Sequence, residues 1–540
     1  MALKRVKITG ITGGRARSRF FPEGGQFTSS AGFDPDLSVG QEQQASGLAV
    51  PSAYTKFSST NVNSPVIAYF GVPQKASTTY AVTANGRLIS YNSSFGAETL
   101  VATVAGGNAG GACYYNNYIY IFGTGASKND VSRFGPLDQP GAALTDAWWT
   151  GLGLTALTNT AYPLIRLASV PNHWGFSHID NSLYFLDFAN GSGLVHRIHT
   201  QKGTGGTPYE GYDNSTIIPS AYGVLDLPYG FYPTSVGSYG TNVAISAMQT
   251  VSATFNQGQG ALFIWNPTNE ITFDQQIFLP DPAATALLSR SGHLYVFSGN
   301  VNRGCRVSEY VGGSTVQERA YIDDGAPPLA GAVEAVGQRI LWGSYCLDPV
   351  ETACVWAINS RTRTKSDDVQ NIACVGTQLA EKSQLCTAIS WIGQQNGDES
   401  DPQIVVANYD DSNTAIYRKT TGGSNTINSV IRFPLVVIGS NFRIDRIRIP
   451  LGDNVQSGTS MELNVLYDDG NSESAVLTIS NSVQPNATRV TFKTPQITGQ
   501  GQNNFILQIS MASTNATIPT PIAFPVEVWV EVFDDEPLYG

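Results

Sequence analysis

The sequence predicts an all-β protein: an irregular β-propeller of about seven blades, followed by a C-terminal β-sandwich of jelly-roll or immunoglobulin-like type. Three observations lead to this prediction. Turn-forming residues are abundant, a turn-and-strand pattern recurs at blade-sized intervals, and that pattern changes near residue 420. The 55 Gly and 28 Pro make up about 15% of the 540 residues, which excludes a coiled coil or a long-helix bundle. The length predicts two or more domains.

The propeller prediction covers residues 51–420. There, a short turn repeatedly precedes a strand of five or six residues rich in β-branched and aromatic side chains. The seven turns are marked by Asn85, Asn117, Asn181, Asn242, Gly292, Gln338 and Pro402. Their spacings run from 32 to 64 residues, with a mean near 53, which suits four-stranded blades with long loops. Six or eight blades, a β-solenoid and a set of sandwiches are the alternatives.

Two strand segments are natural partners for closing the propeller ring. They are residues 66–71, at the start of the repeating region, and residues 415–418, at its end. We expect them to lie together, because radial closure protects strand edges that an open sheet would leave bare.

A second domain is expected over residues 430–540, after a linker at residues 421–429 that begins TGGSN. Its strands alternate over longer stretches and hold fewer aromatic residues. They are expected at residues 430–438, 442–450, 461–467, 474–479, 489–493, 505–511 and 525–533. Seven or eight such strands in about 110 residues predict a β-sandwich that folds alone.

The first 50 residues predict an extended basic arm rather than a domain, because they are Gly-rich and lack sustained periodicity. Six basic residues precede the first acidic residue, Glu23, and form the candidate assembly site: Lys4, Arg5, Lys7, Arg15, Arg17 and Arg19. Ordering such a segment costs roughly 1–2 kcal/mol per residue. We therefore expect a partner surface to compensate, and expect the arm to be mobile in a free monomer.

Charge and hydropathy restrict the partners. A net charge of −11 argues against a protein that coats nucleic acid, so nucleic-acid contact is expected nowhere except at the N-terminal arm. No run of eighteen apolar residues occurs, and we expect no membrane segment. Thr and Gly interrupt the stretch after the first basic residues, which argues against a secretory signal.

The six cysteines are too scattered for a disulfide framework, and no CxxC pair occurs. They are Cys113, Cys305, Cys346, Cys354, Cys374 and Cys386. We expect free thiols that act as small buried hydrophobic side chains, with Cys346 and Cys354 on neighbouring strands.

Tests for catalysis give no positive signal. The motifs G-x-S-x-G, G-x-x-x-x-G-K-[ST] and H-E-x-x-H are absent, and so is the Asp-box S-x-D-x-G-x-x-W of sialidases. Three groups of carboxylates could serve a glycosidase: Asp323-Asp324, Asp348 with Glu351, and Asp410-Asp411. Each lies beside turn residues, where Asp commonly caps backbone donors. We predict a protein that is not an enzyme, with a propeller glycosidase as an alternative.

Metal binding is not expected either. Four of the five histidines fall within 27 residues, namely His173, His178, His196 and His199. Residues three apart on a strand, such as the last two, point to opposite faces. The segment 34–40 resembles a calcium loop but has Ala45 at its twelfth position. No cofactor is therefore expected.

Exposed aromatic residues could stack on sugars. The candidates are Trp148-Trp149 and the segment 229–232, which holds Tyr229 and Tyr232. Packing of these rings in the interior is the favoured interpretation.

The layout resembles that of tail nozzle and related tail or neck proteins of tailed bacteriophages. A basic arm and the segments FFPEGGQ (residues 20–26) and SGLAVP (residues 46–51) lead directly into the propeller. The resemblance covers about residues 10 to 430, by layout and segment character. It implies a non-enzymatic structural virion protein, made in the host bacterial cytoplasm and assembled with other virion proteins as a homo-oligomer.

The C-terminal sandwich departs from that layout. It looks more like the carbohydrate-binding or docking modules of phage tail and fibre proteins. This leaves a receptor- or glycan-binding protein, with a cell-surface glycan as its partner, as the alternative function.

Overall fold

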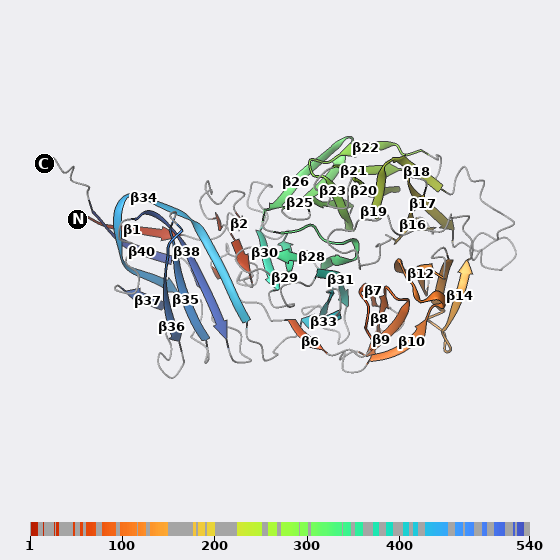
Figure 1. Ribbon diagram of the computed structural model, residues 1–540, viewed down its shortest axis with the longest axis horizontal. Coiled ribbons are helices and arrows are strands. Elements are labelled where there is room, and N and C mark those ends of the chain that lie inside the picture. Colours follow the sequence, from red (N-terminus) through yellow and green to blue (C-terminus); the bar gives the residue numbers. More distant parts are fainter. Residues whose placement is uncertain are drawn as a thin grey trace.

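The computed structural model describes residues 2–8, 14–15, 26–27, 29–31, 47–48, 54–57, 61–71, 78–92, 98–115, 117–125, 130–149, 176–179, 182–189, 192–199, 224–250, 258–266, 272–290, 292–300, 304–323, 325–336, 339–346, 352–359, 371–376, 385–392, 403–409, 414–419, 427–451, 459–467, 470–479, 489–493, 502–513, 522–523 and 526–533. Over these residues the elements are β-strands, apart from two short 3-10 helices, η2 (Ala105–Gly107) and η4 (Ala330–Ala332). The predicted all-β class is confirmed (Figure 1).

Seven antiparallel four-stranded blades form the propeller within the described residues (Figure 1). Blades 1 and 2 are β7 (Val66–Gly71), β8 (Thr78–Thr83), β9 (Arg87–Asn92) and β10 (Glu98–Thr103), then β11 (Gly111–Tyr115), β12 (Tyr118–Thr124), β13 (Asp130–Gly135) and β14 (Ala143–Trp149). Blades 3 and 4 are β15 (Phe176–Ile179), β16 (Ser182–Ala189), β17 (Ser192–His199) and β18 (Val224–Tyr229), then β19 (Phe231–Tyr239), β20 (Asn242–Thr250), β21 (Gly258–Trp265) and β22 (Gln275–Phe278).

The remaining blades follow the same order. Blade 5 is β23 (Ala283–Arg290), β24 (His293–Gly299), β25 (Cys305–Gly312) and β26 (Thr315–Ile322). Blade 6 is β27 (Val333–Val336), β28 (Arg339–Cys346), β29 (Thr352–Asn359) and β30 (Asn371–Gly376). Blade 7 is β31 (Leu385–Ile392), β32 (Gln403–Tyr409), β33 (Thr414–Lys419) and, from far upstream in the chain, β6 (Tyr54–Phe57).

The ring closes through two kinds of contact. The first strands of neighbouring blades contact each other all the way round, and β31 of blade 7 contacts β7 of blade 1. In addition, β6 pairs with β33, with Phe57 opposite Ile416. The expected pairing of residues 66–71 with 415–418 is therefore wrong. Residues 66–71 begin blade 1, because the strand that completes blade 7 comes from the segment before it.

The seven turn markers fall in seven different blades. Five lie, in sequence, between the first and second strands of a blade, and Asn242 is the first residue of the second strand of blade 4, whereas Asn85 lies between the second and third strands of blade 1. This difference accounts for the short first interval of the repeat. Asn117 and Gly292 have φ angles of 69° and 83°, a left-handed conformation that Asn and Gly adopt most readily. Asn181, Gln338 and Pro402 lie outside the described residues.

Apolar side chains fill the spaces between blades. Between blades 5 and 6, the rings of Trp342 and Trp356 stack with centroids 6.4 Å apart, and Phe297 packs against Trp342. Gly343 permits a close approach of blades 6 and 7, because a Cβ there would lie 1.9 Å from the Sγ atom of Cys386. Burial of the whole blade faces supplies the main stabilisation of the ring.

The C-terminal domain is a sandwich of two sheets, as predicted. The 24-residue strand β34 (Ile427–Pro450) belongs to both sheets and contains Gly439, whose φ is 81°. Its first part pairs with β38 (Gln502–Ser513), which continues through β35 (Thr459–Leu466) to β36 (Ser472–Ile479). Its last part pairs with β37 (Arg489–Lys493) and β40 (Val526–Val532). Side chains from both sheets form one apolar core.

The N-terminal arm is bound by its own chain wherever the structure describes it. Strand β1 (Ala2–Ile8) pairs with β40 in the sandwich, and β5 (Gly47–Leu48) pairs with β39 (Ile522–Ala523). The short strands β2 (Gly14–Arg15) and β3 (Gln26–Phe27) pair with each other. The expectation of a mobile arm in a free monomer is thus wrong for residues 2–8, because β40 offers an open edge that satisfies their backbone groups.

Strand β4 (Ser29–Ala31) joins the two domains. Ala31 pairs with Cys374 of β30 on one side and with Val430 of β34 on the other. One continuous sheet therefore runs from blade 6 into the sandwich, where the two parts meet in Figure 1. Of the expected linker, residues 427–429 already belong to β34, and residues 421–426 lie outside the described part. Over the described residues, no helix has the length and apolarity needed to span a membrane.

Candidate docking face

Strand β1 carries the three residues of the predicted assembly site whose side chains the structure describes: Lys4, Arg5 and Lys7. For Arg15 the structure describes only the backbone, in β2, and Arg17 and Arg19 lie outside the described residues. The structure thus brings three of the six predicted residues together on one strand.

The register of β1 against β40 decides which side chains face outward. Arg5 lies opposite Trp529, and Lys7 lies opposite Glu527. The alternate residues Val6 and Ile8 pack against the sandwich core. Because side chains alternate along a strand, Arg5 and Lys7 point away from that core, onto the outer face of the sheet.

Three arginines surround the indole ring of Trp529 on this face. The Cζ atoms of Arg5, Arg446 and Arg448 lie 5.3, 5.0 and 4.9 Å from the ring centroid. Arg5 also forms an ion pair with Glu527, whose side chain is 9% exposed, and Nη1 of Arg448 lies 3.6 Å from Oε2 of the same carboxylate. We call these five residues the Arg–Trp cluster. Guanidinium groups over an indole ring are attracted by its quadrupole.

The other two arginines of the Arg–Trp cluster lie in the last part of β34, where isoleucine and arginine alternate. Ile444, Ile447 and Ile449 enter the core. Arg446 and Arg448 lie on the opposite face, and Asp445 is the extra residue of a β-bulge that restores this alternation. These arginines are not among the site residues predicted from the sequence. The alternating segment RIDRIRI at residues 443–449 was the signal that could have found them.

The outer face of this sheet is basic although the chain is acidic. Among the side chains that the structure describes there, the basic residues are Arg5, Lys7, Arg443, Arg446, Arg448 and Arg489, and the acidic residues are Asp445, Glu527 and Glu531. The Nε atoms of Arg446 and Arg448 are buried without a hydrogen-bond partner. Nε of Arg446 is 3.1 Å from Oδ2 of Asp445, close enough for an ion pair but poorly aligned for a hydrogen bond. Positive charge is therefore in excess on this face.

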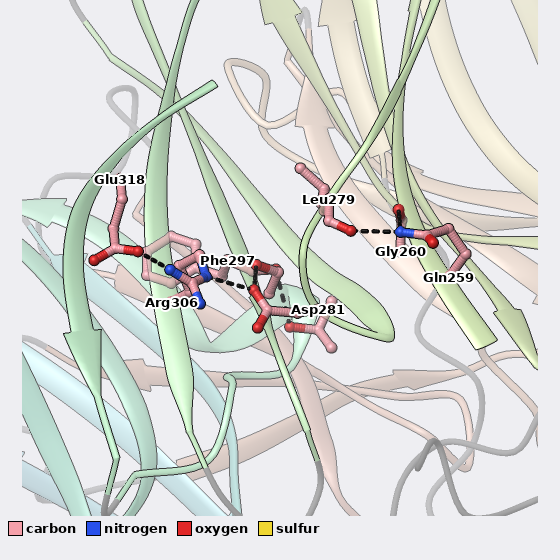
Figure 2. Close-up of polar contacts among 9 residues, drawn as sticks. Gln259, Gly260, Leu279, Asp281, Phe297, Arg306 and Glu318 are labelled. Carbon is pink, nitrogen blue, oxygen red and sulfur yellow. Dashed lines mark hydrogen bonds and ion pairs between the residues drawn. The ribbon is translucent and has the colours of Figure 1, made fainter. Parts of the chain in front are cut away.

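In a second polar cluster, in blade 5, one arginine pairs with two carboxylates. Figure 2 shows Arg306 between two carboxylates, with its Nε donating to Oδ2 of Asp281 at 2.8 Å and its Nη1 pairing with Glu318. Asp281 also accepts a hydrogen bond of 2.6 Å from Ser298 Oγ, and its backbone oxygen accepts from the Gly260 amide of blade 4. These contacts connect blade 4 to blade 5, so we assign the cluster a structural role.

Glu309 in the same blade is buried and has two partners. Arg319 Nε donates to its Oε2 atom at 2.7 Å, and His293 Nδ1 contacts its Oε1 atom. Burial raises the pKa of the Glu309 carboxyl, but the hydrogen bonds and charges of His293 and Arg319 together outweigh that effect and leave the pKa below its ordinary value. Glu309 is therefore held as an anion by its neighbours.

The remaining catalytic and metal candidates lie mostly outside the described residues. Of the carboxylates, only Asp323 is described, exposed just after β26; Asp324, Asp348, Glu351, Asp410 and Asp411 are outside. His173 is also outside, and only the backbones of His178, His196 and His199 are described, in β15 and β17. The segment 34–40 and Ala45 lie outside as well. The described residues contain no group of three or more His, Cys, Asp or Glu side chains that could hold a metal ion.

The aromatic candidates differ in exposure. Trp148 packs against Tyr120, with ring centroids 5.3 Å apart, and Arg133 lies over it at 5.0 Å. Tyr229, in contrast, is 80% exposed at the end of β18. The side chain of Trp149 is not among those described, and Tyr232 is partly buried.

The cysteines whose side chains are described form no disulfide and are buried, namely Cys113, Cys305, Cys354 and Cys386. Burial raises the pKa of the thiols of Cys113, Cys305 and Cys386. Cys346 and Cys354 lie on the neighbouring strands β28 and β29, as expected, although they are not directly opposite each other. These thiols have the character of core residues.

Comparisons with known proteins give weak structural matches. No protein-family model matches the sequence, and no match to a curated protein was found. Among solved structures, the β-propeller domain of Cps50 (Swd1) from Myceliophteria thermophila matches with 8% identity and a TM-score of 0.39, over 69% of this chain and 100% of that chain. U3-55K matches with 9% identity and a TM-score of 0.40, over 68% and 98%.

An exo-β-1,3-galactanase from Phanerochaete chrysosporium also matches, with 8% identity and a TM-score of 0.27, over 66% of this chain and 95% of that chain. At such identities and TM-scores, these three matches carry no information on activity or partners. The assignment of a seven-bladed propeller rests on the closed ring of sheets described above.

Proposed function

We propose that the chain is a non-enzymatic structural protein of a bacteriophage virion, a tail component such as a nozzle, hub or adaptor that assembles with other virion proteins. The observation that carries the proposal is the course of the N-terminal arm. Its strands join the propeller to the sandwich and include the exposed basic edge strand β1, and β6, which follows the arm, completes blade 7. The layout of arm and propeller resembles that of tail nozzle and neck proteins, from which the C-terminal sandwich departs.

The arm suits a mechanical role. Strand β4 pairs on both sides, so backbone pairing connects blade 6 to the sandwich through Ala31. On this proposal, the pairing would hold the propeller and the sandwich together as one part of the tail.

A receptor- or glycan-binding role is the second candidate, and the Arg–Trp cluster favours it. Arginine recognises carboxylate, phosphate and sulfate groups by paired hydrogen bonds, and acidic sugars carry such groups. On this hypothesis the basic face of the sandwich would meet a cell-surface polymer. The same face would serve a protein partner on the first hypothesis.

Labelling of particles tests the main proposal. Antibodies raised against the purified chain would be applied to tailed particles encoded by the same genome and viewed by immunogold electron microscopy. We expect gold at one position on the tail, and peptides of the chain in the purified particles by mass spectrometry. A chain that stays entirely in the supernatant after particle purification would exclude a virion role. Release of sugar by the purified chain from a polysaccharide panel would exclude the non-enzymatic one.

A further inference from the structure

We propose that the open edge of β1 is a docking site for an acidic, extended segment of a protein partner, which adds to the sandwich as a further strand beside residues 2–8. The inference rests on the proposed function, because it names the chemistry of the partner that the assembly strand binds. It concerns the edge of β1 that faces away from β40.

That edge is unoccupied within the described part of the chain. Strand β1 pairs only with β40 there, so one row of its backbone N–H and C=O groups has no strand partner among the described residues. Such a row is a template on which an extended peptide can form main-chain hydrogen bonds. The edge runs the length of Ala2–Ile8, seven residues, which is long enough for an ordinary strand.

The side chains beside the edge select the charge of the incoming strand. Leu3 is 58% exposed and the Arg5 side chain is 44% exposed, while Lys4 and Lys7 are also exposed. Opposite charges across paired strands stabilise by roughly 0.2–1 kcal/mol per pair, and like charges destabilise. A second copy of β1 is therefore a poor partner, because its own basic residues would meet those of the first.

The strand that is already paired with β1 shows which sequence pattern the open edge of β1 would accept. Strand β40 reads VEVWVEV: its valines enter the core, and Glu527, Trp529 and Glu531 lie on the outer face. An added strand would likewise place acidic residues outward, beside Arg5 and Lys7, and apolar residues inward, beside Val6. We therefore expect a partner segment in which acidic and apolar residues alternate.

Two features favour a protein strand over a polysaccharide or a nucleic acid. The ring of Trp529 is already in contact with three guanidinium groups, so it offers little free face for a sugar or a base to stack on. The open edge also presents donors and acceptors at the spacing of a β-strand, which another backbone matches in register. The excess charge of Arg446 and Arg448 would draw the acidic segment toward the face, an effect that salt weakens.

Peptide binding to the full chain tests the proposal. The probe is a fluorescein-labelled peptide of alternating Glu and Val, measured by fluorescence anisotropy at low and at high salt. We expect saturable, salt-sensitive binding, and none of a Lys/Val peptide of the same length. The variant Lys7→Glu reverses an outward-facing charge of β1, keeps the ion pair of Arg5 with Glu527, and should weaken binding by about fivefold or more.

A matched variant controls for general charge. Arg489→Glu makes the same change in net charge on β37, which lies on the other side of β40 and β34 from β1. It should weaken binding by less than about twofold. Equal loss of binding in the two variants, or no loss in Lys7→Glu, would overturn the proposal.

Hydrogen exchange distinguishes the addition of a strand from attraction by charge alone. Binding of the Glu/Val peptide should slow the exchange of the β1 amides that point away from β40, because an added strand would bond them. Heparin and oligothymidylate are the comparison ligands, and neither should protect these amides. Tighter binding of either one than of the peptide would make the face a glycan or nucleic-acid site instead. Peptide binding that leaves the amides unprotected would likewise overturn strand docking.

The two proposals fail separately. Gold on the tail combined with no peptide binding would remove only the strand-docking site. Peptide binding with β1 protection, in a chain that is absent from particles, would remove only the virion role.

Discussion

At the scale of single residues, the two buried carboxylates of the described residues, Glu309 and Glu527, have cationic partners. Glu527 is shared by Arg5 and Arg448, and Glu309 by His293 and Arg319. A charge buried without such partners would be expensive. These pairs therefore tie together strands that are distant in sequence or neighbouring in one blade.

Glu309 gives a prediction about pH. Its pKa in the folded chain lies below the ordinary value, so its ionised form stabilises the fold. That contribution is complete above the pKa of the unfolded chain and is lost as the pH falls through the lower pKa of the folded chain. We expect the unfolding temperature of the propeller to fall below about pH 4.5 for this reason, as followed by differential scanning calorimetry.

The variant Glu309→Gln identifies the residue responsible. It should lower propeller stability by roughly 1–3 kcal/mol at pH 7, because Arg319 would lose its anionic partner, and it should flatten the fall in acid. Asp323→Asn, a change at an exposed carboxylate, is the control and should leave the profile unchanged. A Glu309→Gln profile parallel to that of the wild type would show that other carboxylates cause the acid loss.

At the scale of elements, two strands of very different length hold distant parts of the chain together. Strand β34 supplies an apolar face to both sheets of the sandwich, and its isoleucine and arginine residues separate core from surface. Strand β6, with four residues, completes blade 7 from the far end of the chain. Both strands depend on partners that lie far away in sequence.

Removal of the β6 pairing should weaken the ring. In the variant Thr55→Pro/Lys56→Pro at least one of the two lost N–H groups points toward β33, because donors alternate along a strand. We expect a loss of roughly 1–3 kcal/mol in propeller stability and faster hydrogen exchange in β33. Thr55→Ala/Lys56→Ala keeps the backbone donors and should behave like the wild type. Unchanged exchange in β33 for the proline variant would mean that β6 is dispensable for closure.

At the scale of the whole molecule, the propeller and the sandwich are coupled through backbone pairing. Strand β4 lies between β30 and β34, and β1 completes a sheet of the sandwich although it begins the chain. We expect the two domains of the full chain to unfold together, in one calorimetric transition.

The variant Ser30→Pro tests this coupling. Proline removes a backbone donor from a strand that has neighbours on both sides, which an interior strand tolerates poorly. We expect two separate transitions and faster proteolysis between the domains, whereas Ser30→Ala should keep one transition. A single transition in Ser30→Pro would show that contacts other than β4 hold the domains together.

The sequence by itself determined the parts of this fold that local chemistry encodes. Turn residues followed by apolar strands marked seven blades, because a left-handed turn such as that at Asn117 or Gly292 needs a permissive residue. Alternating strands after residue 420 marked a sandwich, because one face of each strand must be buried. Lys4, Arg5 and Lys7 could be identified as a basic group because the residue types alone give their charge.

Only the tertiary structure decided which strands pair across the chain. Strands β4 and β6 have few residues and no distinctive pattern, and backbone hydrogen bonds carry no information about which segment they join. The docking face could not be predicted from the sequence for the same reason. Arg5 and Arg448 are separated by most of the sequence and share Glu527 only because β40 lies between β1 and β34.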